Sequence, residues 1–217
     1  MPLLMSDLDD TLVERPPLFE AWATEFLAAQ GQSPDLLEWL TEEDHGGHRP
    51  REELYAAIAA RWRIDVPVER FVREHDQAMS GSYRLTPEVR STLVDLRGRG
   101  WRLAVVTNGP VFSQSLKVEA TGLEALVDAV CISEEVGVAK PDPLIFRTAA
   151  DRAGASLAGA WMVGDNLDAD VGGAHGVGAR TVWVKRDYDR LSYVGTTEPD
   201  LVAGSFPDAV RRLLAEA

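Results

Sequence analysis

The second half of the chain alternates short apolar runs with longer amphipathic stretches. From Trp101 onward, five runs with the character of buried strands are bounded by Gly, Asn or Asp: WRLAVVTN, DAVCIS, AWMVGD, ARTVWV and DLVAG. Between these runs, helical periodicity covers Val111–Ala120, Pro143–Ala153, Asp168–His175 and Phe206–Ala215. A further strand is expected in PLLMSDL, Pro2–Leu8. Since strands that alternate with helices form parallel sheets, the pattern predicts an α/β fold with helices on both faces of the sheet.

The segment from Arg15 to Tyr83 has a different pattern. It holds almost no β-branched runs, and its apolar residues recur at helical spacing in three sets: Leu18, Phe19, Trp22 and Phe26; Leu36, Leu37 and Leu40; Leu54, Ile58 and Trp62. Gly31 and the loop His45–His48 separate these sets. We therefore predict that residues 1–14 and 84–217 form one domain and that residues 15–83 form a helical subdomain inserted into it.

Composition and charge exclude several classes of function. The 217 residues include 22 Lys and Arg against 35 Asp and Glu, a net charge of −13, whereas a general nucleic-acid binder needs a basic surface. The single cysteine cannot form an internal disulfide. The N-terminus lacks the pattern of a secretion signal, and no apolar stretch approaches the roughly 20 residues of a membrane-spanning helix. We expect a cytoplasmic protein that binds neither nucleic acid nor membranes.

Polar residues gather where the predicted strands end, the edge at which parallel α/β sheets bind ligands. They are Asp7 and Asp9 after the first strand, Thr107 and Asn108 after the second, Lys140 after the third, and Asp165 and Asp170 after the fourth. Asp7 and Asp9 project to the same side of an extended strand, and their repulsion calls for a cation. Oxygen ligands favour Mg²⁺, while a lysine and a threonine suit phosphate oxygens. Since a carboxylate can attack phosphorus, these residues indicate phosphoryl transfer.

Four segments, in this order, resemble the four motifs of the haloacid dehalogenase (HAD) superfamily. They are DLDDTLV (Asp7–Val13), VVTNG (Val105–Gly109), Lys140 in AKPDP, and VGDNLDAD (Val163–Asp170). The resemblance implies a Rossmann-like parallel sheet, and the helical insert resembles the cap of the superfamily's first subclass. It also implies a phosphoric monoester hydrolase that uses Mg²⁺ as its cofactor.

The resemblance implies a role for each matching residue near the phosphate. Asp7 corresponds to the nucleophile, and Asp9 to the general acid and base. The Thr107 hydroxyl and the backbone at Asn108 correspond to the groups that hold the phosphoryl group. Lys140 corresponds to the cation that stabilises both the phosphoryl group and the nucleophile.

For the metal, the resemblance implies direct binding by Asp165, together with Asp7 and the main-chain carbonyl of Asp9. Asp170 matches the second acidic position, which acts on the metal through water or orients Lys140. The carboxylate at position 9 also separates activities within the superfamily. Its dehalogenases lack this group, because a halide leaves without a proton.

We therefore expect a phosphatase that acts on a small soluble phosphomonoester. His48, Arg49 and Arg51, in the helical insert, are candidate residues for substrate specificity. Two alternatives stay open: a sugar phosphomutase of the same superfamily, and a receiver-type signalling module that accepts a phosphoryl group. Receivers are shorter and lack an inserted cap, which favours the enzyme.

The remaining polar residues have simpler interpretations. The pattern favours a solvated helix face for Glu42–Asp44, helix-surface positions for His75 and His175, and a helix-capping role for Asp168. Cys131 lies in the middle of a predicted strand, where we expect a small buried hydrophobe.

Overall fold

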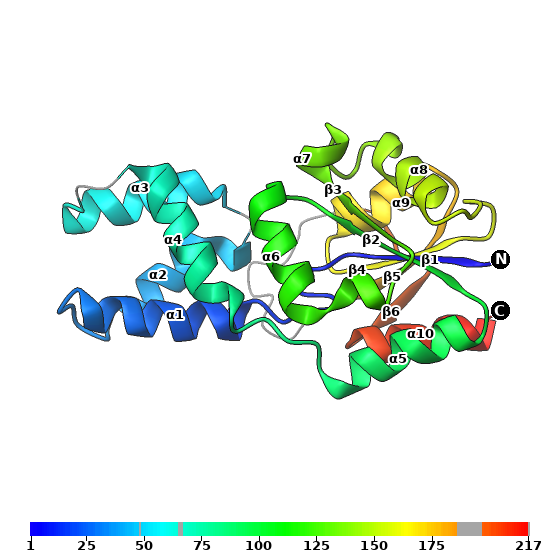
Figure 1. The fold of residues 1–217 in the computed structure, drawn as a ribbon, viewed down its shortest axis with the longest axis horizontal. Helices are drawn as coiled ribbons and strands as arrows, with labels where there is room; N and C mark the ends of the chain where they lie inside the picture. The colour runs from blue at the N-terminus through cyan, green and yellow to red at the C-terminus, as the bar shows by residue number, and fades with distance from the viewer. Residues whose placement is uncertain (48, 65–66, 186–196, 217) are drawn as a thin grey trace. The chain divides into compact units, whose positions relative to one another are not determined.

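A computed structural model describes residues 1–47, 49–64, 67–185 and 197–216 of the chain. These residues divide into two compact units (Figure 1). The core unit comprises Met1–Val13 and Arg84–Ala217, and the helical unit comprises Glu14–Tyr83. None of the helices in the described ranges is both long enough and apolar enough to cross a bilayer.

The described residues of the core unit form a six-stranded sheet in the order β3-β2-β1-β4-β5-β6, with every neighbouring pair parallel. The strands are β1 (Leu3–Ser6), β2 (Arg102–Thr107), β3 (Ala129–Ile132), β4 (Trp161–Gly164), β5 (Arg180–Val184) and β6 (Leu201–Ala203). In the middle of the sheet, Ser6 of β1 is in register with Val105 of β2 and Val163 of β4. The predicted α/β fold with a Rossmann-like parallel sheet is confirmed.

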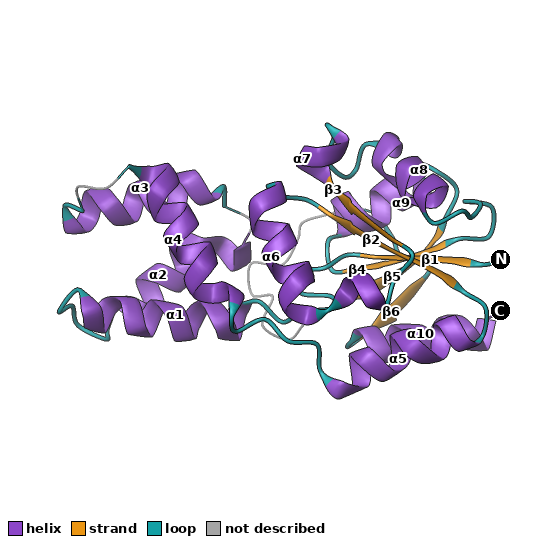
Figure 2. Ribbon diagram, viewed as in Figure 1, coloured by secondary structure: helices purple, strands orange, loops and turns teal. Residues whose placement is uncertain are grey.

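Helices cover both faces of this sheet, as the alternating pattern predicts. On one face, α5 (Pro87–Gly98) packs beside α10 (Phe206–Glu216), and on the other, α8 (Pro143–Arg152) packs beside α9 (Gly173–His175) (Figure 1). The core unit also holds α6 (Val111–Thr121) and α7 (Ser133–Val136), which Figure 2 labels. Two short turns complete its described helical segments: the 3₁₀ turn η2 (Leu123–Ala125) and the π-helical turn η3 (Leu167–Gly172).

Alternate strand residues supply the core beneath α8, because successive side chains of a strand point to opposite faces. Leu3 and Met5 of β1 are fully buried in one cluster with Ile145 and Phe146 of α8. Cys131 of β3 belongs to the same cluster and is fully buried, which confirms its interpretation as a small hydrophobe.

Two helix starts differ from the sequence prediction. Helix α5 lies outside the predicted stretches, although its start carries ordinary signals: Thr86 accepts a hydrogen bond from the Val89 N–H at 3.2 Å, and Pro87 follows the cap. The capping role expected of Asp168 is wrong. Asn166 is the cap, because its Oδ1 accepts from the N–H groups of Asp168 and Ala169 at 3.0 and 2.9 Å, and Asp168 itself is exposed.

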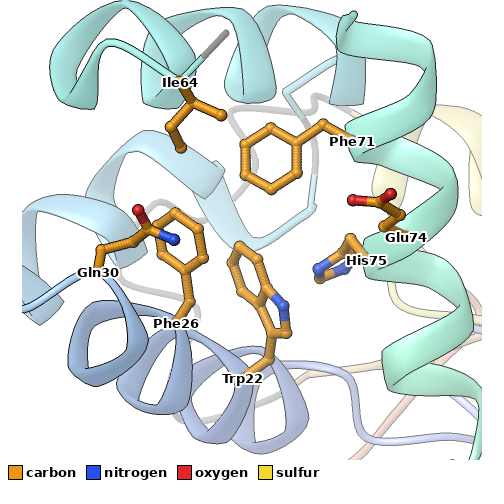
Figure 3. Close-up of a pocket in the computed structure, with 7 residues that line it drawn as sticks. All are labelled: Trp22, Phe26, Gln30, Ile64, Phe71, Glu74 and His75. Atoms are coloured by element: carbon orange, nitrogen blue, oxygen red, sulfur yellow. The ribbon is translucent and has the colours of Figure 1, made fainter. Parts of the chain in front are cut away.

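The helical unit consists of α1 (Pro16–Ala29), α2 (Leu36–Asp44), the 3₁₀ turn η1 (His45–Gly47), α3 (Arg51–Trp62) and α4 (Val68–Ser80). Its core is rich in aromatic rings. Trp22 stacks on Phe26 with ring centroids 5.1 Å apart, and the His75 ring lies 4.3 Å from Trp22, edge to face. A cavity of about 290 Å³ lies beside these rings (Figure 3), lined by Trp22, Phe26, Gln30, Ile64, Phe71, Glu74 and His75.

Two sequence interpretations in this unit are wrong. His75 is only 3% exposed, because α4 turns it toward the rings of α1 rather than toward solvent. Asp44 is 4% exposed, because Arg15 binds both of its carboxylate oxygens at 2.5 and 2.7 Å. Glu42 and His175 are exposed, as expected.

Candidate active site

The carboxyl ends of β1, β2 and β4 lie side by side, because these three strands are parallel neighbours in the middle of the sheet. Asp7 directly follows β1, and its N–H donates to the carbonyl oxygen of Val163 in β4 at 2.9 Å. Thr107 is the last residue of β2, and Asp165 directly follows β4. Three of the four candidate motifs therefore meet at one edge of the sheet.

Three carboxylates form a buried cluster at this edge, which we call the acidic cluster: Asp7, Asp165 and Asp170. One carboxylate oxygen of each lies within 4.8 Å of the others. Lys140 enters this cluster, with its Nζ 2.6 Å from Oδ1 of Asp7 and 2.7 Å from Oδ1 of Asp170. All four residues are buried, so three carboxyl groups share the Lys140 ammonium away from water.

The pKa values reflect this excess of negative charge. Burial raises the pKa of Asp7 from 3.8 to about 7, although Lys140 opposes the increase. Burial and the neighbouring carboxylates of Asp7 and Asp170 also raise the pKa of Asp165. Burial by itself lowers the pKa of Lys140, but Asp170 and Asp7 outweigh it and raise the pKa above its usual value. Lys140 is therefore a permanent cation, while the carboxylates need further positive charge to ionise together.

A hard divalent cation fits this cluster. The ligand atoms are all oxygens, which Mg²⁺ prefers, and a divalent ion removes the repulsion among the carboxylates. The carboxylate of Asp9 is not part of the acidic cluster within the described residues.

The backbone beneath the acidic cluster is shaped to receive Asp170. A Cβ atom at Gly164 would lie 2.2 Å from Oδ2 of Asp170, a distance that no side chain tolerates. The Asn166 N–H donates to the same carboxylate at 3.0 Å. The end of β4 and the π-helical turn η3 thus hold the Asp170 carboxylate in the acidic cluster beside Lys140.

The side chain of Asn108 fixes the loop that carries Lys140. Its Nδ2 donates to the Lys140 carbonyl at 3.0 Å, and its Oδ1 accepts from the Lys140 N–H at 2.8 Å. The side-chain amide of Asn108 is therefore used within the protein. Thr107 is 1% exposed, and its hydroxyl accepts a hydrogen bond from Gln114.

The structure adds two residues that the sequence did not suggest. Lys117 of α6 places its Nζ 2.7 and 2.6 Å from the two carboxylate oxygens of Asp9. Gln114, one turn earlier, donates from Nε2 to Oδ2 of Asp9 at 3.1 Å. Both are buried on the face of α6 that also buries Val118. The buried face of α6 is largely polar, and Val111 and Phe112 are exposed, so the pattern of apolar residues gave no signal for these two side chains.

The candidate specificity residues lie in the helical unit. Arg49 pairs with Glu43 and, at 4.0 Å, with Glu53. Arg51 pairs with the buried Asp76. Both arginines are thus engaged by carboxylates of their own unit, and His48 lies outside the described residues.

The chain is similar in sequence to known hydrolases. The sequence model of the haloacid dehalogenase-like hydrolase family matches residues 1–178. A phosphoserine phosphatase of Thermus thermophilus is 42% identical over 136 residues, which cover 63% of this chain but only 53% of that protein's length. A glyceraldehyde 3-phosphate phosphatase of Methanopyrus kandleri is 34% identical over 195 residues, which cover 84% of this chain and 83% of that protein.

Solved structures share the fold. A HAD phosphatase from Thermococcus onnurineus superposes with a TM-score of 0.71 at 28% identity, over 99% of this chain and 98% of that one. A putative β-phosphoglucomutase from Thermotoga maritima superposes with a TM-score of 0.78 at 18% identity, over 100% of both chains, which is a likeness of fold alone. With the family match across the four motifs, this chain belongs to the haloacid dehalogenase-like hydrolases.

Proposed function

We propose that this protein is a Mg²⁺-dependent phosphatase that hydrolyses a small phosphomonoester through an aspartyl-phosphate on Asp7. The observation that carries the proposal is the 2.6 Å contact between Lys140 Nζ and Asp7 Oδ1 inside the acidic cluster. A carboxylate that is fixed by a buried cation, next to a set of oxygen ligands, suits in-line attack on phosphorus. The names of the phosphatase relatives agree with this chemistry.

The reaction divides into two displacements. In the first, a carboxylate oxygen of Asp7 attacks phosphorus, the bond to the leaving oxygen breaks, and Asp9 gives that oxygen a proton. In the second, a water oxygen attacks phosphorus, Asp9 takes a proton from that water, and the bond between phosphorus and Asp7 breaks. Asp9 thereby recovers the proton that it gave, and Asp7 returns to a carboxylate.

The other site residues bind the phosphoryl group or the metal, or orient the residues that react. Lys140 holds Asp7 in place and offsets the charge of the phosphoryl group, while the Thr107 hydroxyl and the Asn108 N–H hold its oxygens. Asp165, the Asp7 carboxylate and the Asp9 carbonyl would hold Mg²⁺, which neutralises charge on the transferred group when bound. Asp170 supports the site by orienting Lys140, a role consistent with their 2.7 Å contact.

We further propose that residues 15–83 act as a cap that selects the substrate and limits access of water. The chain leaves the core unit after Val13, four residues beyond Asp9, so the insertion begins at the proposed reaction centre. Arg49 is 24% exposed at its side chain, against 16% for Arg51, and is the more accessible of the two candidate specificity residues.

Phosphate release from a panel of monoesters, with Mg²⁺ or with EDTA, tests the proposal. The panel includes phosphoserine, glyceraldehyde 3-phosphate, a nucleoside 5′-monophosphate and a hexose 1-phosphate, with Asp7→Asn as the control. Borohydride reduction of the trapped aspartyl-phosphate should convert Asp7 to homoserine. Mass spectrometry of the reduced protein then identifies the modified residue.

Magnesium-dependent phosphate release together with homoserine at position 7 supports the proposal. Activity that is unchanged in EDTA, or an adduct at another residue, contradicts it. Isomerisation of the hexose phosphate without phosphate release would instead show a mutase, and a phosphoenzyme that persists without turnover would show a receiver.

A further inference from the structure

The carboxylate of Asp9 is held by a buried lysine that belongs to none of the four motifs. Lys117 is 1% exposed, and its Nζ contacts both Asp9 oxygens at 2.7 and 2.6 Å. A lysine is rarely buried to this extent unless a partner compensates its charge. The contact joins residues 108 positions apart, so the packing of α6 against the β1 loop is what creates it.

Gln114 connects Asp9 to the second motif. Its Nε2 donates to Asp9 Oδ2 at 3.1 Å and also to the Thr107 hydroxyl. Gln114 and Lys117 are three residues apart on α6, so their side chains lie on one face of the helix. The helix begins four residues after Thr107, so its position is tied to the end of β2.

The backbone of Asp9 is fixed separately. The turn from Asp9 to Val13 closes through a bridge between these two residues, and the Asp10 N–H donates to the Val13 carbonyl at 2.7 Å. Asp10 adopts the left-handed region at φ 56°. The turn sets where the Asp9 side chain starts, but the direction of its carboxylate depends on the groups around it. Its side chain is 26% exposed, so it borders solvent as well as Lys117.

We propose that Lys117 and Gln114 are positioning residues that aim the carboxylate of Asp9, without binding phosphate themselves. The inference rests on the proposed function, in which Asp9 exchanges protons with the leaving oxygen and with water. A general acid or base acts only within hydrogen-bond reach of the atom that it serves, and a shift of about 1 Å can cost a factor of about 100 in rate. Two donors that converge on one carboxylate provide this alignment.

The test uses Lys117→Met, which keeps the length of the side chain and removes the ammonium. With p-nitrophenyl phosphate the leaving group departs without a proton, so transfer to Asp7 does not depend on Asp9. Hydrolysis of the phosphoenzyme still needs Asp9 to accept a proton from water. We expect a burst of about one equivalent of nitrophenolate, followed by a steady-state rate about 10–100-fold below that of the wild type.

Three companion variants make the result specific. Lys117→Arg restores the cation and should recover most of the steady-state rate. Thr121→Val, a buried change one turn further along α6, should leave both phases as in the wild type. Gln114→Leu keeps the ammonium and should lower the steady-state rate about 10-fold with the burst retained, which provides the test if Lys117→Met does not fold. Circular dichroism and thermal melting check the fold of each variant.

The outcomes separate the possible roles of Lys117. Equal losses in the burst and in the steady state would show a general structural effect and overturn the proposal. A raised KM with the kcat of the wild type would overturn it too, because it would make Lys117 a phosphate-binding group. An inactive wild type would refute the proposed function together with this inference, whereas an active wild type with an unaffected Lys117→Met variant refutes the inference alone.

Discussion

At the scale of single residues, Asp9 and Asp7 are two carboxylates with different surroundings. Asp7 is buried with Lys140 in the acidic cluster, whereas the Asp9 carboxylate faces Lys117 and Gln114. Because a general acid and base contributes about 10²–10⁴ in rate, we expect Asp9→Asn to lower kcat by such a factor. Mg²⁺ binding, measured by isothermal titration calorimetry, should stay within a few-fold of the wild type, since the Asp9 carbonyl is kept.

Asp168→Asn is the matched control, because Asp168 is an exposed carboxylate close to the same motif. Its turnover should equal that of the wild type. If Asp9→Asn turns over at the wild-type rate, Asp9 is not the acid and base. A loss of Mg²⁺ binding in that variant would point to its carboxylate as a metal ligand.

What the sequence predicts at this scale depends on how local the contact is. Asp7, Asp9 and Lys140 follow from short motifs and from the rule that ligands bind at strand ends. The contact of Lys117 with Asp9 spans 108 positions and depends on the rotation of α6 about its axis, which no local pattern defines. The burial of His75 and Asp44 differs from the sequence prediction for the same reason, because it depends on tertiary partners: the rings of α1 for His75 and the guanidinium of Arg15 for Asp44.

At the scale of elements, the junction of β4 and η3 determines where Asp170 lies. A methyl group at Gly164 would collide with Asp170, so Gly164→Ala should push that carboxylate away from Lys140. Supporting residues of metal sites typically contribute 10–100-fold, and we expect an activity loss of about that size. Steady-state kinetics and Mg²⁺ titration measure it. Gly98→Ala is the control, because a Cβ there meets nothing within 4 Å, and it should change neither quantity.

The first and second helices of the helical unit are joined by a buried ion pair. Asp44 ends α2, and Arg15 immediately precedes α1. Their side chains are each 6% exposed, so removing one partner leaves a buried charge without compensation. We expect Asp44→Ala to lower the free energy of unfolding by about 3–5 kcal/mol in urea titrations. Glu42→Ala, an exposed neighbour, should change it by less than about 0.5 kcal/mol. Equal effects of the two substitutions would contradict the importance of the pair.

Elements were easier to predict than their ends. The strands and the helices α6, α8 and α10 have strong periodicity, so the sequence located them closely. Helix α5 lies outside the stretches that the sequence predicts, although Thr86 and Pro87 are typical residues for a helix start. The π-helical turn η3, capped by Asn166, carries the Asp170 that contacts Lys140, and this tertiary contact is not readable from the local sequence.

At the scale of the whole molecule, the acidic cluster links folding to pH and to metal. In the metal-free protein the pKa of Asp7 is raised from 3.8 to about 7, so between these values the folded state holds a proton that the unfolded chain has released. The contribution of Asp7 to stability therefore falls as pH rises from about 4 to about 7, by the linkage of proton binding to folding. The raised pKa of Asp165 acts in the same direction.

Asp165→Asn removes one of the crowded carboxylates while keeping its size. At pH 8 without metal, we expect this variant to melt at a higher temperature than the wild type. The difference should shrink as the pH falls to about 3, below the unfolded-state pKa of 3.8, where the carboxylates are mostly protonated in both states. Mg²⁺ should reverse the order, because an ion at about 100 times its Kd stabilises the wild type by about 2.7 kcal/mol and the variant by much less. Thermal melts at both pH values, with Mg²⁺ and with EDTA, check all three statements. If wild type and variant respond equally to Mg²⁺, the ion does not bind at Asp165, and the proposed metal site is wrong even if the enzyme is a phosphatase.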